Sequence, residues 1–296
     1  MISFENVSKW TLSDVSIHIP RGKTVGLIGA SGAGKTTFIK LACGLLEASG
    51  GSVYTMGLRP VKEQKKLGRN MSALFTDVPF LEKEDTVAGN FEALRRIYHI
   101  KAEDFRADYW ELSERLGFTD LIDRKVQELS LGQRRRAEIG AALIQRPGLL
   151  LLDEPTSGLD EDAKQNFYEL IKEREREGVT ILLTSHNMAE ISKVCSRIAL
   201  LDQGKLLYYG TEEQLKKRFA PIDTMSLELE GRLPDLEDLP LVRYVVEEDK
   251  LTLSYNANYV TAAEILKLIT QQTVVKEVKI RKPDLSDIIL CLKDKK

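Results

Sequence analysis

The sequence predicts an α/β protein with a parallel sheet and an inserted helical subdomain, followed by a small α+β domain. Two short apolar segments, 148–152 and 179–184, each follow a helical stretch, which is typical of buried parallel strands. Between the strand expected at 24–28 and the segment 148–152, residues 91–116 carry apolar side chains at helical spacing in a charged background. We therefore predict a helical subdomain over about residues 86–145.

Alternation and turn residues predict the other elements of the first domain. Apolar and polar residues alternate from 15 to 19, which indicates a half-buried strand with His18 facing solvent rather than binding a ligand. Residues 198–209 predict a hairpin that turns at 202–204, and residues 211–214 open a helix with a capping-box pattern. We place the end of this domain just before Pro221, so that it comprises residues 1–220.

The remaining residues, 221–296, predict an accessory domain with a different order of elements. The order is β-α-β-β-α-β, the split ferredoxin-like arrangement. We expect strands near 227–229, 242–246, 251–255 and 274–280, a short helix after the first strand, a helix at 262–269, and a last helix at 285–292. This domain contains no nucleotide-binding pattern, so we expect it to serve dimer contacts or regulation.

The composition excludes several classes of protein. Hydrophobic residues make up 43% and charged residues 30% of the chain, the balance of a soluble globular protein. A net charge of -2 gives no field that would attract nucleic acid. Cys43, Cys195 and Cys291 are scattered, which argues against a disulfide framework or a zinc site. Neither a signal peptide nor a membrane-spanning segment is apparent, so we expect a cytoplasmic protein.

A phosphate-binding loop follows the strand expected at 24–28. Gly29–Thr36 satisfies G-x-x-x-x-G-K-[ST] between a strand and a helix. The glycines let backbone N–H groups surround phosphate oxygens, Lys35 adds a charge, and the Thr36 hydroxyl can bind Mg²⁺. The expected nucleotide contacts come from this loop and the next residue, namely Gly29, Ser31, Gly32, Ala33, Gly34, Lys35, Thr36 and Thr37.

Two adjacent carboxylates end the apolar segment 149–152. Asp153 is placed to bind Mg²⁺, and Glu154 to orient or deprotonate an attacking water, as phosphoryl transfer requires. The alternative is a solvated strand end followed by a helix cap.

Ser130 and Gln133 form a capping-box pattern at a helix start, followed by three arginines at 134–136. Positive charge in a first turn opposes the helix dipole, and would be favourable if an anion approached. Alternatively, the arginines pair with nearby acidic residues. The pattern leaves both possibilities open.

These motifs together resemble the ABC ATPase family over essentially all of residues 1–220. Gly29–Thr36 matches the Walker A motif, residues 129–133 the signature motif and residues 149–153 the Walker B motif. The resemblance implies a catalytic role for Glu154 and a switch role for His186. It also implies nucleotide contacts for Ser130, Gly132, Gln133, the D-loop Asp160, and Trp10 as an aromatic stacked on adenine; Trp10 could otherwise be a core residue.

The resemblance further implies ATP and Mg²⁺ as cofactors and a head-to-tail dimer. One set of motifs is present, so two copies would form the active unit. The single cassette and the tail 283–290 look most like the ATPase subunit of a bacterial ABC-2-type exporter, which works at the cytoplasmic face of the membrane with a separate transmembrane permease. The alternatives are a soluble ABC ATPase acting on DNA or ribosomes, and a nucleotide-binding regulator with little turnover.

One position departs from the family pattern. After the strand that ends at Phe75, the family has a glutamine that contacts Mg²⁺ and relays nucleotide state, whereas this chain has Thr76 and Asp77. We predict that Asp77 contacts the metal in its place. The alternative is that Asp77 is an ordinary turn residue before Val78 and Pro79.

Overall fold

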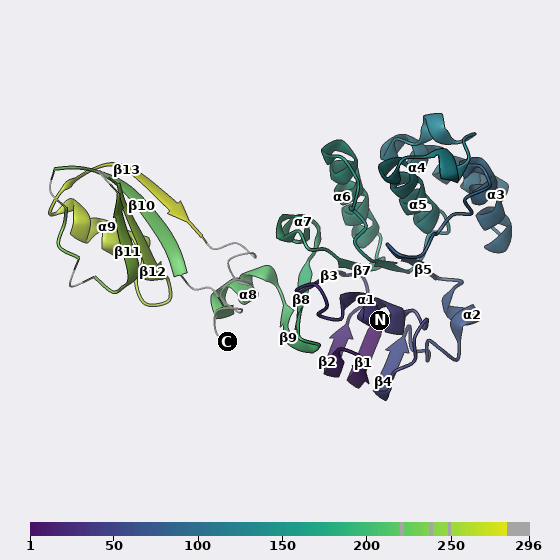
Figure 1. The fold of residues 1–296 in the computed structure, drawn as a ribbon, viewed down its shortest axis with the longest axis horizontal. Coiled ribbons are helices and arrows are strands. Elements are labelled where there is room, and N and C mark those ends of the chain that lie inside the picture. Colours follow the sequence, from purple (N-terminus) through teal and green to yellow (C-terminus); the bar gives the residue numbers. More distant parts are fainter. Residues whose placement is uncertain (220–221, 232, 237–238, 248–249, 283–296) are drawn as a thin grey trace. The chain divides into compact units, whose positions relative to one another are not determined.

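The computed structural model describes residues 1–219, 222–231, 233–236, 239–247 and 250–282 (Figure 1). The chain divides into two compact units, Met1–Thr211 and Glu212–Lys296. Within the described residues, no helix is both long enough and apolar enough to cross a membrane.

A six-stranded sheet forms the centre of the first unit, which confirms the predicted α/β fold. Five of its strands are parallel, and β9 pairs antiparallel with β8. The strand order is β5 (Met71–Leu74), β6 (Leu149–Leu152), β7 (Thr180–Thr184), β3 (Thr24–Ile28), β8 (Arg197–Asp202) and β9 (Lys205–Gly210). Every residue of β3, β6 and β7 is buried, which explains their continuous apolar character.

A smaller antiparallel sheet packs on one side of this centre. It has the order β2 (Leu12–Ile19), β1 (Ile2–Lys9) and β4 (Gly50–Thr55). Strand β2 alternates buried and exposed residues, and His18 is exposed as predicted. Helix α1 (Lys35–Ala42) lies between the two sheets (Figure 1), where Phe38 stacks on Phe4 with 4.1 Å between ring centroids.

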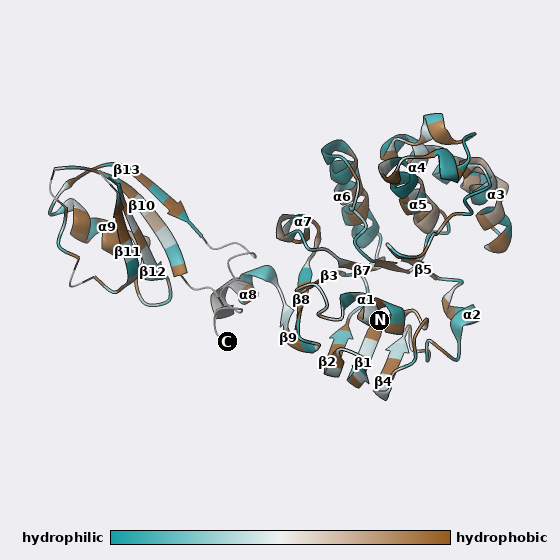
Figure 2. Ribbon diagram, viewed as in Figure 1, coloured by the Kyte–Doolittle hydropathy of each residue, from teal (hydrophilic) through white to brown (hydrophobic). Residues whose placement is uncertain are grey.

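Helices cover the other face of the main sheet. Helix α6 (Glu161–Arg176) and the shorter α7 (Met188–Val194) lie there, and the mostly brown sheet contrasts with the teal residues of α6 in Figure 2. A helical subdomain follows β5 and contains α3 (Val87–Ile97), α4 (Ala102–Leu116) and α5 (Leu131–Leu143). Residues 91–116, whose apolar side chains follow helical spacing, span parts of two helices, α3 and α4, which are separated at His99 with a φ of 53°.

Two short elements complete the path through this unit. Helix α2 (Gln64–Leu67) precedes β5, and two 3-10 turns, Thr119–Leu121 and Val126–Glu128, lead from α4 to α5. An aromatic cluster holds the helical subdomain together, since Phe91 contacts Tyr109 and Phe118 with centroid distances of 4.8 and 5.6 Å.

The second unit begins with α8 (Glu212–Phe219) and contains a four-stranded antiparallel sheet. Its order is β11 (Leu241–Glu247), β12 (Lys250–Asn256), β10 (Ile222–Glu230) and β13 (Val274–Arg281), as a ferredoxin-like domain requires. Helix α9 (Ala262–Thr270) begins with a capping box of Thr261 and Glu264, and buries Ile265 and Ile269 against the sheet.

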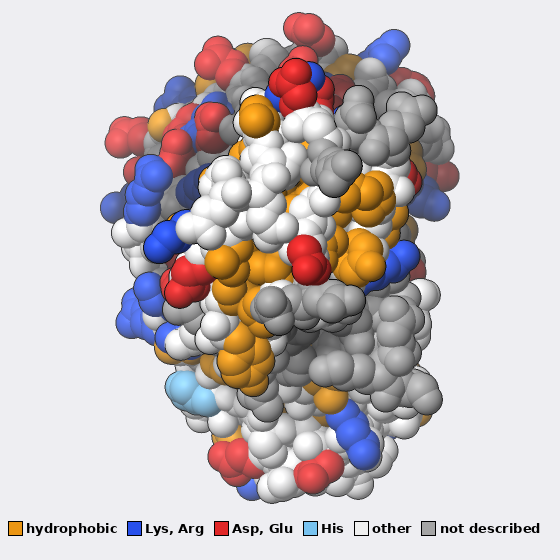
Figure 3. Space-filling view, turned by 90° about the vertical axis from the view of Figure 1, so that its left-hand side faces the viewer, with side chains coloured by type: hydrophobic (Ala, Val, Ile, Leu, Met, Phe, Trp, Pro, Cys, Tyr) orange, Lys and Arg blue, Asp and Glu red, His pale blue; other side chains and the backbone are white. Residues whose placement is uncertain are grey.

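The helix expected between β10 and β11 is absent among the residues described there. Residues 233–236 and 239–240 are not helical, so α9 is the one described helix on this sheet. The last helix expected, at 285–292, lies outside the described residues. Hydrophobic side chains gather on the face of this unit that Figure 3 displays. The unit's exposed apolar residues include Tyr244, Val246, Tyr259, Leu268 and Ile280.

Candidate functional site

The phosphate loop runs from the end of β3 to the start of α1. Gly34 is the N-cap of α1 with a φ of 101°, and a Cβ there would lie 2.5 Å from the Leu12 side chain. Gly32 has a φ of 78° and open space around it. Glycine adopts both conformations at little cost, so the backbone path of this loop accounts for the glycines at these two positions of the motif. It leaves the first N–H groups of α1 without side-chain caps, which suits an anion.

Lys35 reinforces the shape of this loop. Its Nζ donates to the carbonyl oxygens of Gly29 at 2.9 Å and Ala30 at 3.1 Å. The ammonium group is therefore held above the loop, where phosphate oxygens would meet it.

A chain of hydrogen bonds connects the loop to the ends of β6 and β7. The Thr36 hydroxyl donates to Asp153 Oδ2 at 2.8 Å, and the Thr184 hydroxyl donates to Asp153 Oδ1 at 2.7 Å. The Asp153 residue is only 5% exposed, so both carboxylate oxygens are fixed in a buried position. Thr36 and Asp153, which were predicted to share a metal, thus lie in direct contact.

Glu154 adopts a backbone conformation that is rare for a residue with a side chain. Its φ is 48°, and its N–H donates to the Thr184 hydroxyl at 2.8 Å. The carboxylate meets His186, with 2.8 Å between Oε2 and Nδ1. The His186 side chain is 80% exposed, and that of Glu154 is 23% exposed. The two residues predicted to be catalytic therefore meet at the mouth of the site, where water can reach them.

These groups surround one hollow with a volume of about 390 Å³. It is lined by Trp10, Thr11, Ser31, Gly32, Gly34, Lys35, Thr36, Thr37, Asp153 and Glu154. Trp10 is 72% exposed and carries the Lys9 ammonium 5.6 Å from its ring centroid, so it is not a core residue. The loop, the carboxylates and an exposed aromatic side chain, far apart in sequence, thus form one cavity.

The signature segment does not line this hollow. Ser130 and Gln133 form the expected capping box at the start of α5, and Leu131 is 61% exposed. A Cβ on Gly132 would lie 2.5 Å from the Gly158 carbonyl oxygen, so this segment packs closely on the loop after Glu154. Asp160, in the same loop, caps α6 and pairs with Arg136.

All three arginines of α5 pair with acidic residues in the structure. Arg134 and Arg135 contact Glu138, and Arg136 contacts Asp160. The structure therefore favours the second of the two alternatives that the sequence leaves open. Arg135 differs from its neighbours because it is buried and reaches the ends of β5 and β6.

Asp77 lies beside Lys40, with 2.8 Å between Oδ2 and Nζ. This ammonium group lowers the pKa of the Asp77 carboxyl. Thr76, the residue before Asp77, contacts the end of β6 instead. Its hydroxyl donates to the Asp153 carbonyl oxygen at 3.0 Å. A metal contact by Asp77 stays a prediction, and would require its side chain to exchange Lys40 for the metal.

Thr76, Arg135 and Thr184 belong to this site but were not predicted as site residues. Thr184 is the last residue of β7, a buried strand that pairs in parallel with β6. Its position at the end of an apolar segment can be recognised in the sequence. Thr76 and Arg135 contact each other across 59 residues of sequence, and no local pattern marks that pairing.

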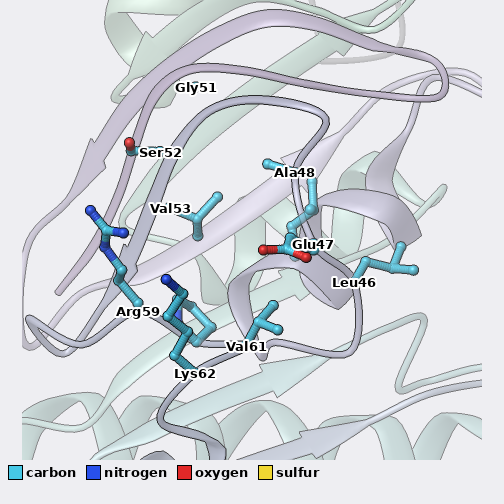
Figure 4. Close-up of a pocket in the computed structure, with 11 residues that line it drawn as sticks. Leu46, Glu47, Ala48, Gly51, Ser52, Val53, Arg59, Val61 and Lys62 are labelled. Carbon is cyan, nitrogen blue, oxygen red and sulfur yellow. The ribbon is translucent and has the colours of Figure 1, made fainter.

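A second hollow, of about 150 Å³, lies away from these groups (Figure 4). Its lining comes from the end of α1, from β4 and from the segment before α2, and includes Leu46, Glu47, Val53, Arg59 and Lys62. It shares no residue with the phosphate loop or the carboxylate pair, so it is not the nucleotide site.

Comparison with known proteins agrees with this geometry. The family model described as ABC transporter matches residues 12–157. The ABC transporter ATP-binding protein NatA of Bacillus subtilis is 35% identical over 202 residues, which cover 68% of this chain and 82% of NatA. The daunorubicin resistance ATP-binding protein DrrA3 of Streptomyces coeruleorubidus is 29% identical over 96% of this chain and 91% of its own length.

A solved structure gives the same result. The ATP-binding cassette MJ0796, a dimer in a post-hydrolysis state with ADP and phosphate, has a TM-score of 0.64 and 26% identity, covering 71% of this chain and 98% of its own. The resemblance noted from the motifs is thereby confirmed. The chain belongs to the ABC transporter family, and it is an ATP-binding and ATP-hydrolysing subunit of that family.

Proposed function

We propose that two copies of this chain bind two ATP molecules between them and use hydrolysis to drive export through a separate transmembrane permease. Each ATP would lie between the phosphate loop of one copy and Ser130, Gly132 and Gln133 of the other. The observation that carries this proposal is the separation of these two half-sites within one chain, since the signature residues do not line the hollow of the phosphate loop. A second copy supplies the missing half.

Within each site we assign the water-activating role to Glu154. Its carboxylate lies on the same hollow as the phosphate loop, and His186 holds one of its oxygens at 2.8 Å. A carboxylate fixed in this way can accept a proton from water as the water attacks the terminal phosphate. His186, which is largely exposed, can then orient Glu154 or contact the phosphate.

Thr36 and Asp153 fit a magnesium ion. The described residues contain no cluster of three or more His, Cys, Asp or Glu side chains suited to a metal. Mg²⁺ is usually bound by one or two protein oxygens together with phosphates and water, and the adjoining Thr36 hydroxyl and Asp153 carboxylate supply those oxygens. When bound there, the ion would neutralise charge on the phosphates.

The export direction and the membrane location rest on relatives. DrrA3, named for daunorubicin resistance, aligns with nearly the whole chain. We infer that this chain works at the cytoplasmic face of a membrane as a peripheral subunit. Isolating the chain from a membrane extract of its host tests this, because a polytopic membrane protein should accompany it. If only soluble proteins accompany it, the permease assignment is wrong.

We assign Asp77 a contact to the metal that depends on nucleotide. An Asp77→Asn variant should bind ATP normally but require at least about three-fold more Mg²⁺ for half-maximal turnover, because a charged ligand is lost. The measurement is ATP hydrolysis over a series of Mg²⁺ concentrations. Lys40→Met serves as the matched variant, since it removes the other half of the ion pair. An unchanged Mg²⁺ requirement in Asp77→Asn would leave Asp77 as a turn residue.

The second unit is assigned to dimer contacts or regulation. It has its own core, built from residues such as Leu227, Leu253 and Ile265, and all the site residues described above precede residue 187. A chain shortened to residues 1–220 should therefore unfold cooperatively and bind ATP with an affinity within about three-fold of the full chain. Thermal unfolding and equilibrium binding of ATP measure both properties. A folded fragment without ATP binding would show that this division of roles is wrong.

A further inference from the structure

Arg135 is a buried charged residue in contact with the site, and neither nucleotide binding nor water activation involves it directly. The residue is 4% exposed and lies in the second turn of α5, the helix that begins at Ser130. Its charged partner is Glu138, with 3.3 Å between Nη1 and Oε2. Burial lowers the pKa of Arg135 and raises that of Glu138, while each attracts the other in its charged form. Burying a charge is costly, so its placement calls for a reason.

The guanidinium group joins three segments that are distant in sequence. Nη1 donates to the Phe75 carbonyl oxygen at 3.2 Å, and Nη2 contacts the Thr76 hydroxyl at 3.2 Å. Nη2 also lies 3.2 Å from the Glu154 carbonyl oxygen and 3.5 Å from that of Asp153. The planar guanidinium group of an arginine carries five N–H donors in a fixed geometry, so it can reach several acceptors that lie on separate segments at once. Arg135 therefore fastens the ends of β5 and β6 to α5.

The contact with Glu154 matters because that residue holds a strained backbone. A left-handed conformation costs a residue with a side chain on the order of 1–2 kcal/mol, and persists where the surroundings fix it. The Glu154 N–H is fixed by Thr184 and the Glu154 carbonyl oxygen by Arg135. Both peptide groups that flank the Glu154 Cα are thereby held, and the carboxylate is directed toward His186.

We propose that Arg135 is a positioning residue, which holds the backbone of Glu154 so that its carboxylate is aligned for hydrolysis and ties that alignment to the helix carrying the signature segment. This inference rests on the proposed function of Glu154. Arg135 touches neither ATP nor water in this role. Its loss should therefore affect the hydrolytic step far more than the binding of nucleotide.

The test compares Arg135→Ala and Arg135→Gln with the parent chain. We expect kcat to fall at least about five-fold in Arg135→Ala, while the KM for ATP changes less than about three-fold and the number of ATP sites per chain is unchanged. Arg135→Gln retains a planar polar group without the charge, so it keeps the segment folded if the alanine variant does not. The matched control is Arg96→Ala, which removes an arginine that is 74% exposed in the same subdomain and contacts Glu92.

Two results would overturn the proposal. In the first, kcat falls less than five-fold in both Arg135 variants. In the second, the number of ATP sites falls in proportion to kcat in both variants, which indicates a purely structural role. A Glu154→Gln variant in the same assay separates this from the proposed function. If Glu154→Gln abolishes turnover and kcat falls less than five-fold in both Arg135 variants, the inference about Arg135 alone fails.

Discussion

A Glu154→Gln chain is expected to bind ATP as the parent does and to lose at least about 99% of its turnover. Replacing the carboxylate by an amide keeps the size of the side chain but removes the proton acceptor, and general-base catalysis contributes about 10²–10⁴-fold. The phosphate loop, Thr36 and Asp153 are unchanged in this variant. Steady-state ATP hydrolysis and equilibrium binding measure the two quantities separately.

The same variant should accumulate an ATP-bound dimer, because the step that separates the two copies no longer occurs. Size-exclusion chromatography with and without ATP detects this. Glu177→Gln is the matched control, since Glu177 is the exposed C-cap of α6 and pairs with Arg174. Turnover within about ten-fold of the parent in Glu154→Gln would show that another group activates the water.

The second large effect is expected at Lys35. A Lys35→Ala chain should bind ATP about 10- to 100-fold more weakly, because hydrogen bonds to a charged group contribute about 1.5–3 kcal/mol each. The variant also removes the bonds from Nζ to the Gly29 and Ala30 carbonyl oxygens, so the loop itself loses support. Equilibrium binding of ATP measures the loss.

Lys23→Ala controls for the change in net charge. Lys23 is exposed and precedes β3, whereas the phosphate loop follows that strand. The Lys23→Ala variant should bind ATP with the affinity of the parent chain. If Lys35→Ala also binds ATP with parental affinity, the loop does not hold the phosphates in the way proposed.

Local sequence patterns predicted the parts of the site that depend on local backbone geometry. The phosphate loop needs glycines with positive φ before a helix, and the carboxylate pair follows an apolar strand. Each feature therefore produces a short sequence pattern that can be recognised. The capping box at Ser130 is confirmed for the same reason. Short-range chemistry of this kind is set by neighbouring residues.

Contacts between distant segments could not be predicted in this way. The partners of Arg135 are fixed by the side-by-side arrangement of β5 and β6 and by the crossing of α5 above them, which no stretch of sequence encodes alone. The break between α3 and α4 at His99 has no marker in the sequence, because the turn contains neither glycine nor proline, the usual markers of such a turn. Residues 233–236 show a wrong prediction, because the short helix expected after the first strand of the second unit does not form there.

Trp10, on the turn between β1 and β2, forms an aromatic wall of the hollow that also contains the phosphate loop. Stacking recognises the flat face of a base, which all nucleobases share, whereas hydrogen bonds to the edge of a base distinguish one from another. If the base of the nucleotide stacks on this indole, that contact by itself would hold guanine as well as adenine. The relative abundance of purine nucleotides around the protein, more than the protein itself, would then determine which one is consumed.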